Sequence, residues 1–276
     1  MNARLPCLVI LITITMQAAA VAQPARRTPR STRGKQAAAV KQKAPDLPAV
    51  EQGITERANK LRSAQDLPAL EVDPQLAKAA VYFASYMAAN NKYGHTADEK
   101  TLTQRAEEHG YKYCLVLENI AYQYDSAGIP TDRLIEEFAG GWERSPPHRE
   151  NLLHPHVTQT AVAIAQSKKT QYYYAVQLFG RPRSSEFEFT IKNETGQTLV
   201  YRIAKESFEL PPRHTMTHQR CLPSKLEFQE LAPATGQAAE SSSKKSALVL
   251  DISQSGHWLV KIGAGGKLTA GIAPAK

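Results

Sequence analysis

Residues 142–153 read Trp142-Glu143-Arg144-Ser145-Pro146-Pro147-His148-Arg149-Glu150-Asn151-Leu152-Leu153. In this stretch one histidine follows two prolines and precedes two charged residues, an asparagine and two leucines. Proline fits the first turn of a helix, and a serine before it can cap free backbone amides. We therefore predict a helix that begins after Ser145 and presents His148 from a rigid first turn. Taken alone, the stretch favours a plain surface histidine on a short helix. The rest of the chain has to decide whether His148 is functional.

The chain has 276 residues and a formal charge of +8, which allows one large or two modest domains. The charge is concentrated in residues 23–48, which hold seven lysines and arginines against one aspartate. The remainder is close to neutral, which argues against a specific nucleic-acid partner. The basic, Pro/Ala-rich segment 23–48 is predicted to be a disordered linker. It either binds an anionic surface such as a cell envelope or serves as a solubilising spacer.

Residues 1–22 are typical of a secretory signal peptide. Arg4 supplies the positive charge, residues 8–14 form an apolar run, and residues 20–22 read Ala-Val-Ala, an Ala-x-Ala cleavage site. We expect cleavage near Ala22, a secreted or periplasmic protein, and no transmembrane segment in the mature chain. Cys114 and Cys221 then remain, one in each predicted domain. They either pair in an oxidising compartment or stay as two solitary thiols.

Residues 49–183 combine helical and strand patterns. Helices are predicted from Ile54 to just before Leu67, from Pro74 to about Asn90, from Leu102 to His109, and from Thr131 to Trp142, where Gly140 and Gly141 end the pattern. Strands are predicted over 115–124, 158–165 and 171–179. Glu118 stands out within the first of these strands, because a buried carboxylate needs a partner or a shifted pKa.

Residues 184–276 have a different pattern, with short β-rich runs separated by Gly, Pro and polar turns. The runs cover 187–191, 198–203, 226–229, 247–252 and 258–262. This spacing predicts a small antiparallel β-sandwich or barrel. Residues 232–246, rich in Ala, Ser, Gly and Lys, are predicted to be a flexible loop within it.

Residues 54–182 carry an ordered set of short motifs. These are Asn59-x-x-Arg62, Leu67-Pro68-x-Leu70, Asp73-Pro74-x-Leu76, His95, Glu118-Asn119-Ile120-Ala121, Trp142-x-x-Ser145-Pro146-x-His148-Arg149-x-Asn151-Leu152, and Tyr174-x-Val176-Gln177-x-Phe179-Gly180. In this order they resemble the CAP family of cysteine-rich secretory, antigen 5 and pathogenesis-related proteins, and its SCP-like bacterial branch most closely. The resemblance implies an α+β fold. A CAP domain (49–183), with an antiparallel sheet between two helical layers in an α-β-α sandwich, would precede a small all-β domain (184–276).

The resemblance also implies a cleft in which His95, Glu118 and His148 converge, and which in some relatives binds a divalent metal. Two neutral imidazoles and a carboxylate could hold zinc with an open fourth position. Without metal, the carboxylate could instead accept a hydrogen bond from a protonated histidine. Glu143 is a weak candidate for a second acidic residue of the family. Its place directly after Trp142 turns the side chain to another side of the helix, so we expect it to be exposed.

Two functions fit these residues. The first is a binding module for a small apolar or cell-envelope ligand, by analogy with CAP domains linked to lipids and sterols. The alternative is a metal-dependent, peptidase-like hydrolase with His95 and His148 as ligands and Glu118 as ligand or general base. Binding is favoured because the second acidic residue is not in its usual place. Whether the chain is an enzyme stays open, although no nucleophile is evident, since Ser145 suits a helix cap and Cys114 has no assignable base.

Overall fold

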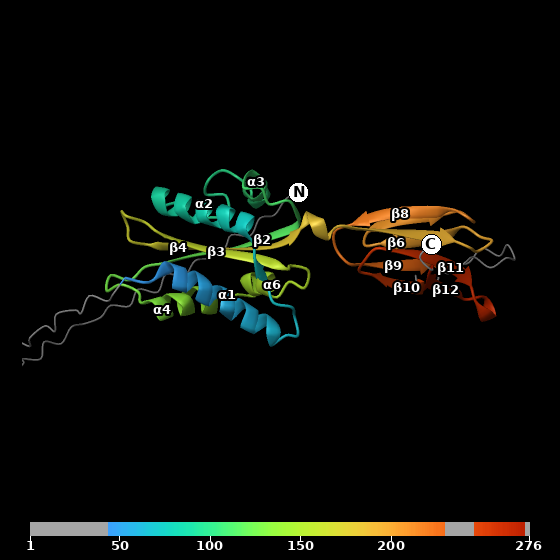
Figure 1. Cartoon of the computed structure of the whole chain (residues 1–276), viewed down its shortest axis with the longest axis horizontal. Coiled ribbons are helices and arrows are strands. Elements are labelled where there is room, and N and C mark those ends of the chain that lie inside the picture. The colour runs from blue at the N-terminus through green and yellow to red at the C-terminus, as the bar shows by residue number, and fades with distance from the viewer. Residues whose placement is uncertain (1–43, 230–245, 274–276) are drawn as a thin grey trace, which may run out of the picture. The chain divides into compact units, whose positions relative to one another are not determined.

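The computed structural model describes residues 44–229 and 246–273. The predicted signal peptide, most of the basic segment and nearly all of the predicted 232–246 loop lie outside these residues. Figure 1 shows a part built of helices and strands, followed along the chain by a part built of strands.

Three helices begin directly after a residue whose side chain caps the first turn. In α1 (Leu47–Ser63), the Asp46 carboxylate accepts a hydrogen bond from the Ala49 amide, so the helix begins seven residues before the predicted start at Ile54 and includes the last two residues of the predicted linker. In α2 (Pro74–Asn90), Asp73 accepts from the amides of Gln75 and Leu76. A capping box starts α3 (Leu102–Glu108). Satisfying the free amides of the first turn explains each of these starts.

The predicted helix over 131–142 continues past its glycines. It consists of α4 (Thr131–Ile135), the π-helical turn η1 (Glu136–Gly140) and α5 (Gly141–Arg144). The prediction that Gly140 and Gly141 end the helix was wrong, because both adopt right-handed helical backbone angles. The chain then enters α6 (Pro146–Leu152), with its two prolines in the first turn, as the opening stretch predicts.

The sheet of this first domain has the order β1-β3-β4-β2. Its strands are β1 (Glu71–Val72), β2 (Tyr113–Gln123), β3 (Gln159–Gln166) and β4 (Tyr173–Pro182). The three long strands pair antiparallel, as expected, whereas the two-residue β1 adds a parallel edge. The other edge of the sheet is β2, which places Glu118 on an edge strand.

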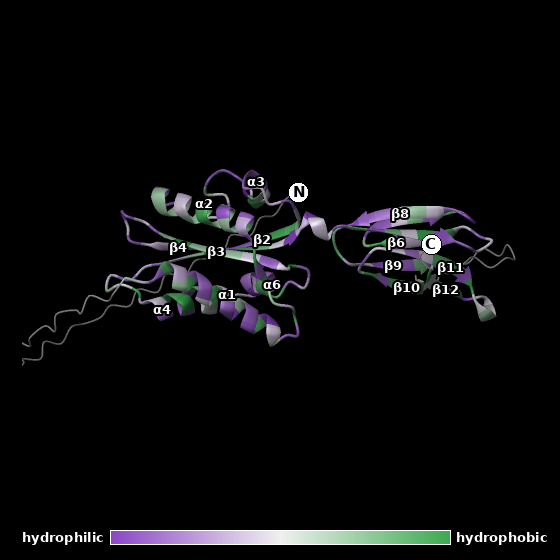
Figure 2. Ribbon diagram, viewed as in Figure 1, coloured by the Kyte–Doolittle hydropathy of each residue, from purple (hydrophilic) through white to green (hydrophobic). Residues whose placement is uncertain are grey.

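Each face of the sheet packs against its own helical layer. Alternate residues of β4 point to opposite faces, so Phe179 joins the core under α1 and α4, while Val176 joins the core under α2. Figure 1 shows α2 and α3 on one side of the sheet and α1, α4 and α6 on the other. In Figure 2, α1 and α2 each carry hydrophobic and hydrophilic residues together, as helices that cover a sheet do. The α-β-α sandwich is confirmed.

The second domain is a β-sandwich of two four-stranded sheets, ordered β10-β9-β6-β7 and β12-β11-β5-β8. Its strands are β5 (Phe187–Asn193), β6 (Leu199–Ile203), β7 (Glu206–Leu210), β8 (Thr215–Arg220), β9 (Ser224–Gln229), β10 (Ser246–Ile252), β11 (Gly256–Ile262) and β12 (Leu268–Ile272). Both sheets contribute to one core that includes Phe189 and Phe228. The all-β prediction is confirmed, except that β11 pairs with β5 in parallel.

Cys114 of β2 and Cys221, which lies between β8 and β9, form a disulfide. The backbone carbonyl of Cys221 also accepts a hydrogen bond from Arg181 Nε of β4, at 2.8 Å. Of the two alternatives that the sequence left open, the structure has the paired one. The disulfide joins the two domains covalently.

Candidate functional site

The site is built around the edge strand β2, whose side chains alternate between the two helical layers. Glu118 faces the layer of α2 and α3, where it contacts Arg105. Asn119 faces the layer of α6, where its Nδ2 donates to the carbonyl of His148 at 3.1 Å. The two layers meet at this edge because no further strand follows β2 in its sheet. Residues from both layers can therefore reach the same strand.

Both carboxylate oxygens of Glu118 have a partner. His95 Nδ1 lies 2.7 Å from Oε1, and the Arg105 guanidinium donates to Oε2 at 2.8 Å. The Glu118 side chain is only 2% exposed, whereas that of His95 is 60% exposed. The hydrogen bond to Glu118 raises the pKa of His95 above its ordinary value of 6.5. His95 is thus a solvent-facing imidazole held by a buried carboxylate, which favours its protonated form.

Arg105 of α3 contacts most of the groups on this side of the site, and it was not among the site residues predicted from the sequence. Its guanidinium is 1% exposed and also donates to the Asp98 carboxylate and to the carbonyls of His95 and Lys100. It lies over the ring of Phe83, 3.6 Å from the centroid. Arg105 therefore fixes the loop that carries His95 as well as the carboxylate that His95 contacts.

His148 approaches from the opposite layer. Its Nδ1 lies 2.9 Å from Ser145 Oγ, so the serine holds the imidazole instead of a backbone amide, and the predicted side-chain cap was wrong. Burial lowers the pKa of His148, and the charge of His95 lowers it further. The structure thus brings His95 and Glu118 into direct contact. It places His148 near enough to His95 for the charge of His95 to lower the pKa of His148.

The structure does not gather the three expected zinc ligands around one point. Glu118 pairs with the His95 imidazole and the Arg105 guanidinium, so it lies where a carboxylate that orients a histidine would lie. Across residues 44–229 and 246–273, no group of three His, Cys, Asp or Glu side chains is placed to hold a metal ion. The His95–Glu118 contact is the hydrogen-bonded pair that the sequence left as the alternative role of Glu118.

A small cavity of about 240 Å³ opens between His148 and the edge of β2. Its walls are mixed: they include the aromatic residues Tyr93, Tyr122, Phe138 and Trp142 as well as the polar residues Gln123, Glu137 and Ser145. Gly141 also lines the cavity, and a Cβ placed there would meet no atom within 4 Å. Pockets for drug-sized ligands have about 300–1,000 Å³, so this cavity suits one small group or one ring of a larger ligand.

Side chains from both layers occupy the free hydrogen-bonding edge of β2. The carbonyl of Ile120 accepts from Trp142 Nε1 at 3.3 Å and from the Tyr93 hydroxyl at 3.2 Å. Asn151 Nδ2 donates to the carbonyl of Glu118. Exposed edge carbonyls invite pairing with another chain. These three donors block such pairing and fix the cavity walls at the same time.

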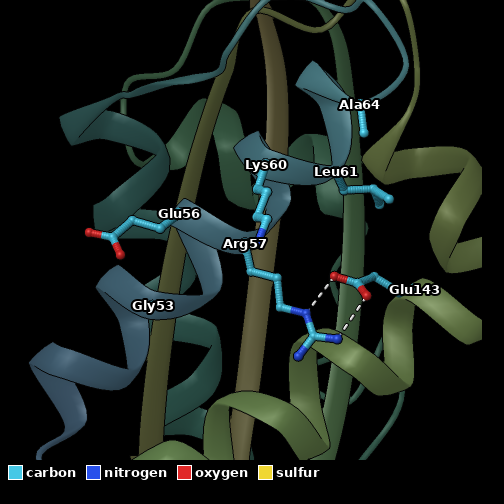
Figure 3. Close-up of a pocket in the computed structure, with 7 residues that line it drawn as sticks. All are labelled: Gly53, Glu56, Arg57, Lys60, Leu61, Ala64 and Glu143. Carbon is cyan, nitrogen blue, oxygen red and sulfur yellow. Dashed lines mark hydrogen bonds and ion pairs between the residues drawn. The ribbon is translucent and has the colours of Figure 1, made fainter.

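Glu143 does not join this site, and the expectation that it is exposed was wrong. Figure 3 shows it turned toward α1, where it accepts two hydrogen bonds from Arg57, at 2.6 and 2.8 Å. Arg57 also pairs with Glu136, and these carboxylates raise the pKa of Arg57. The neighbouring hollow is lined by Gly53, Lys60 and Leu61. Glu143 thus anchors α5 to α1 by a bidentate ion pair.

The layers and the edge-strand site define an α-β-α domain with a histidine–carboxylate pair beside a small aromatic cavity. Residues 55–179 match the model of the cysteine-rich secretory protein family, CAP. This part of the chain belongs to the CAP family. No curated protein sequence matches the chain significantly.

Among solved structures, three bacterial proteins illustrate the similarity. An outer surface protein of Borrelia burgdorferi is 22% identical, with 49% of this chain and 93% of that one covered and a TM-score of 0.43. An extracellular SCP-domain protein of Bacillus anthracis is 28% identical, with 49% and 41% covered and a TM-score of 0.41. A cysteine-rich secretory protein of Staphylococcus aureus is 18% identical, with 49% and 40% covered and a TM-score of 0.37. Less than half of the last two proteins is matched.

No helix within the described ranges, 44–229 and 246–273, combines the length and the apolarity needed to cross a membrane.

Proposed function

We propose that the chain is an exported binding module whose CAP domain takes a small apolar group, or one ring of a cell-envelope ligand, into the cavity beside His148. The proposal rests on the hydrogen bonds that Glu118 makes. With one oxygen on His95 and the other on Arg105, the Glu118 side chain is only 2% exposed and is placed to hold His95 and Arg105 together, whereas a general base or an open metal ligand would have to face the substrate. The aromatic cavity next to it, in contrast, is open.

The cavity walls support a ligand that is apolar on one side and polar on the other. Tyr93 and Tyr122, each about half exposed, offer aromatic surface, while His148 presents an imidazole whose pKa is lowered by burial, which favours the neutral ring. A neutral imidazole can both donate and accept one hydrogen bond. Few convergent polar groups on an aromatic wall are typical of small-molecule sites.

Export is supported by two independent features. The first 22 residues have the pattern of a signal peptide, and Cys114 and Cys221 form a disulfide, which persists mainly in oxidising compartments. Sequencing the N-terminus of the exported protein tests the predicted cleavage after Ala22. An intact leader on the exported chain would contradict that prediction.

The cavity can be tested by filling it. Gly141 is helical, with open space where a side chain would lie, so Gly141→Leu should occupy the cavity without breaking the helix. We expect the full chain to bind the neutral fluorophore 1-aminoanthracene saturably, and Gly141→Leu to weaken this binding about tenfold or more, since a filled pocket loses its apolar contacts.

Gly141→Ala is the matched control, because it adds only a methyl group and should retain most of the binding. Equal affinity in Gly141→Leu and the wild type would overturn the proposed site. Hydrolysis of casein by the wild type that is lost in His148→Ala would favour the hydrolase alternative instead. Hydrolysis by the His148→Ala variant should be compared with that of the wild type at a pH at which the two proteins have matching unfolding curves.

A further inference from the structure

Five tyrosines form a continuous array at the end of the CAP sheet. The β2–β4 pairing sets Tyr122 directly opposite Tyr174. The ring centroids of Tyr93 and Tyr122 lie 4.7 Å apart, those of Tyr122 and Tyr172 5.6 Å, and those of Tyr124 and Tyr172 5.0 Å. Tyr93, Tyr122 and Tyr124 are each about half exposed. Tyr174 belongs to the core under α2, and Tyr172 packs against that core. The tyrosine array, as we call these five residues, thus presents its other three rings to solvent at the rim of the core.

The tyrosine array and the Glu118 network lie on one face of the same strand. Side chains two residues apart share a face, so Glu118, Ile120, Tyr122 and, just beyond the end of β2, Tyr124 form a row. Six residues at about 3.3 Å each make this row about 20 Å long. Tyr93 and Tyr122 also line the cavity beside His148. Ile120 and the Glu118 side chain are each only 2% exposed. The accessible part of the row is therefore Tyr122 and Tyr124, and it continues through Tyr93 into the cavity beside His148.

We propose that this row binds an extended, β1,4-linked chain of pyranose sugars, with successive rings stacked on the tyrosine array and one ring in the cavity beside His148. The inference rests on the proposed binding function and names its ligand class. A pyranose ring has an apolar C–H face and a rim of hydroxyls. It therefore suits an aromatic face with hydrogen-bonding groups around it.

The composition of the row favours a sugar chain over a lipid. Each exposed ring of the row is a phenol, which has a polar hydroxyl at its tip, and the cavity that Tyr93 and Tyr122 line also presents the imidazole of His148. Lipid tails would be matched better by aliphatic side chains, and the cavity is too small for a whole lipid. β1,4-linked pyranose chains are extended and expose the faces of their rings, which matches a row along a strand.

The test is binding of the full chain to soluble glycol chitin and hydroxyethylcellulose, measured by affinity electrophoresis. We expect binding by the wild type, a Kd about 2–10-fold higher in Tyr124→Ala or Tyr122→Ala, and about tenfold or more in the double variant, as expected for lost aromatic contacts. Tyr122→Phe keeps the ring and should bind within about threefold of the wild type, because the contact is mainly to the ring face.

Tyr113→Ala, at the opposite end of β2, is the matched control and should bind as the wild type does. No binding of either glycan, or equal binding by the double variant, would overturn the inference. So would array-dependent binding to phosphatidylcholine and phosphatidylglycerol vesicles without glycan binding. Binding of 1-aminoanthracene separates the two proposals: if it persists while the glycans fail, only the ligand class is wrong, and if both fail, the binding site itself is wrong.

Discussion

Two histidines, one in each domain, differ in their exposure, in their hydrogen-bond partners and in the direction in which their pKa values are shifted. His95 of the CAP domain faces solvent and contacts a buried carboxylate, which raises its pKa. His218 of the β-sandwich is buried among aromatic rings, where its Nε2 lies 2.6 Å from the Tyr201 hydroxyl. Burial lowers the pKa of His218.

The difference follows from what surrounds each ring. At the edge of a sheet covered by two helical layers, charged groups from several elements reach one place, and water reaches it too. In the middle of a small sandwich, the inner faces of the strands offer mainly apolar side chains, so a neutral ring with one hydrogen bond costs least. A binding site can form at the first position, whereas the second holds a core together.

Among the substitutions that test this contrast, Arg105→Met should have the largest effect on stability. The substitution leaves the carboxylates of Glu118 and Asp98 buried without their cation. We expect the CAP domain to lose about 3–5 kcal/mol of unfolding free energy. Denaturant unfolding can follow each domain separately, because Trp142 lies in the CAP domain and Trp258 in the sandwich.

Arg144→Met is the matched control, because the Arg144–Glu136 pair is exposed and should contribute about 1 kcal/mol or less. If the two variants cost the same, the buried network does not hold the site together. The transition reported by Trp258 should be unchanged in both.

In the sandwich, Tyr201→Phe removes the hydroxyl that pairs with His218. A buried ring nitrogen is then left without a partner, and we expect a loss of about 1–3 kcal/mol from the transition reported by Trp258. Tyr113→Phe, which removes a long hydrogen bond from an exposed hydroxyl, should change the CAP transition by less. Unchanged stability in Tyr201→Phe would mean that water replaces the lost partner.

The two histidines should give opposite dependences of stability on pH. His95, which faces Glu118, Arg105 and His148, has a raised pKa. Its contribution is fully present below the unfolded value of about 6.5 and is lost as the pH rises through the folded pKa. The His95 contribution should therefore make the CAP domain less stable as the pH rises through this range, whereas His148, His154 and His156, whose pKa values burial lowers, contribute in the opposite direction.

His218, which faces Tyr201, Arg220 and Glu206, has a lowered pKa. Its unfolded form gains a proton first as the pH falls below about 6.5, so the sandwich should become less stable toward acid. Urea midpoints of both transitions between about pH 5 and 8 measure the two slopes. His95→Asn should change the slope of the CAP transition alone, by removing the contribution that is lost as the pH rises, and an unchanged CAP slope in this variant would contradict the assignment.

The smallest expected effect is at Gly141. Because Gly141 is helical and a Cβ would meet no neighbour, Gly141→Ala should stabilise the CAP domain by about 0.5–1 kcal/mol. Gly140→Ala is the comparison, since a Cβ there would displace the Glu136 side chain and should give a smaller gain. A loss of stability in Gly141→Ala would show that the cavity wall has no room for a methyl group.

Much of the fold could be predicted from local chemistry. Asp73 before Pro74, and Ser145 before two prolines, mark helix starts because the amides of a first turn need acceptors or no proton at all. The strands β7 and β8 were missed because their sequences, Glu206–Leu210 and Thr215–Arg220, are largely polar. The tyrosine array was missed although its signal was present, since Glu118, Ile120, Tyr122 and Tyr124 alternate along one strand.

By itself, the sequence determined that Glu118 is a carboxylate in an apolar strand and so requires a partner, and that His95 and His148 stand in the order of the CAP motifs. Only the tertiary structure decided which partners Glu118 has. Arg105 reaches it from a helix 13 residues earlier in the chain, while Glu143 turns away to Arg57, 86 residues distant. Ion pairs depend on distance in space, which the packing of layers around an edge strand sets and the spacing along the chain does not.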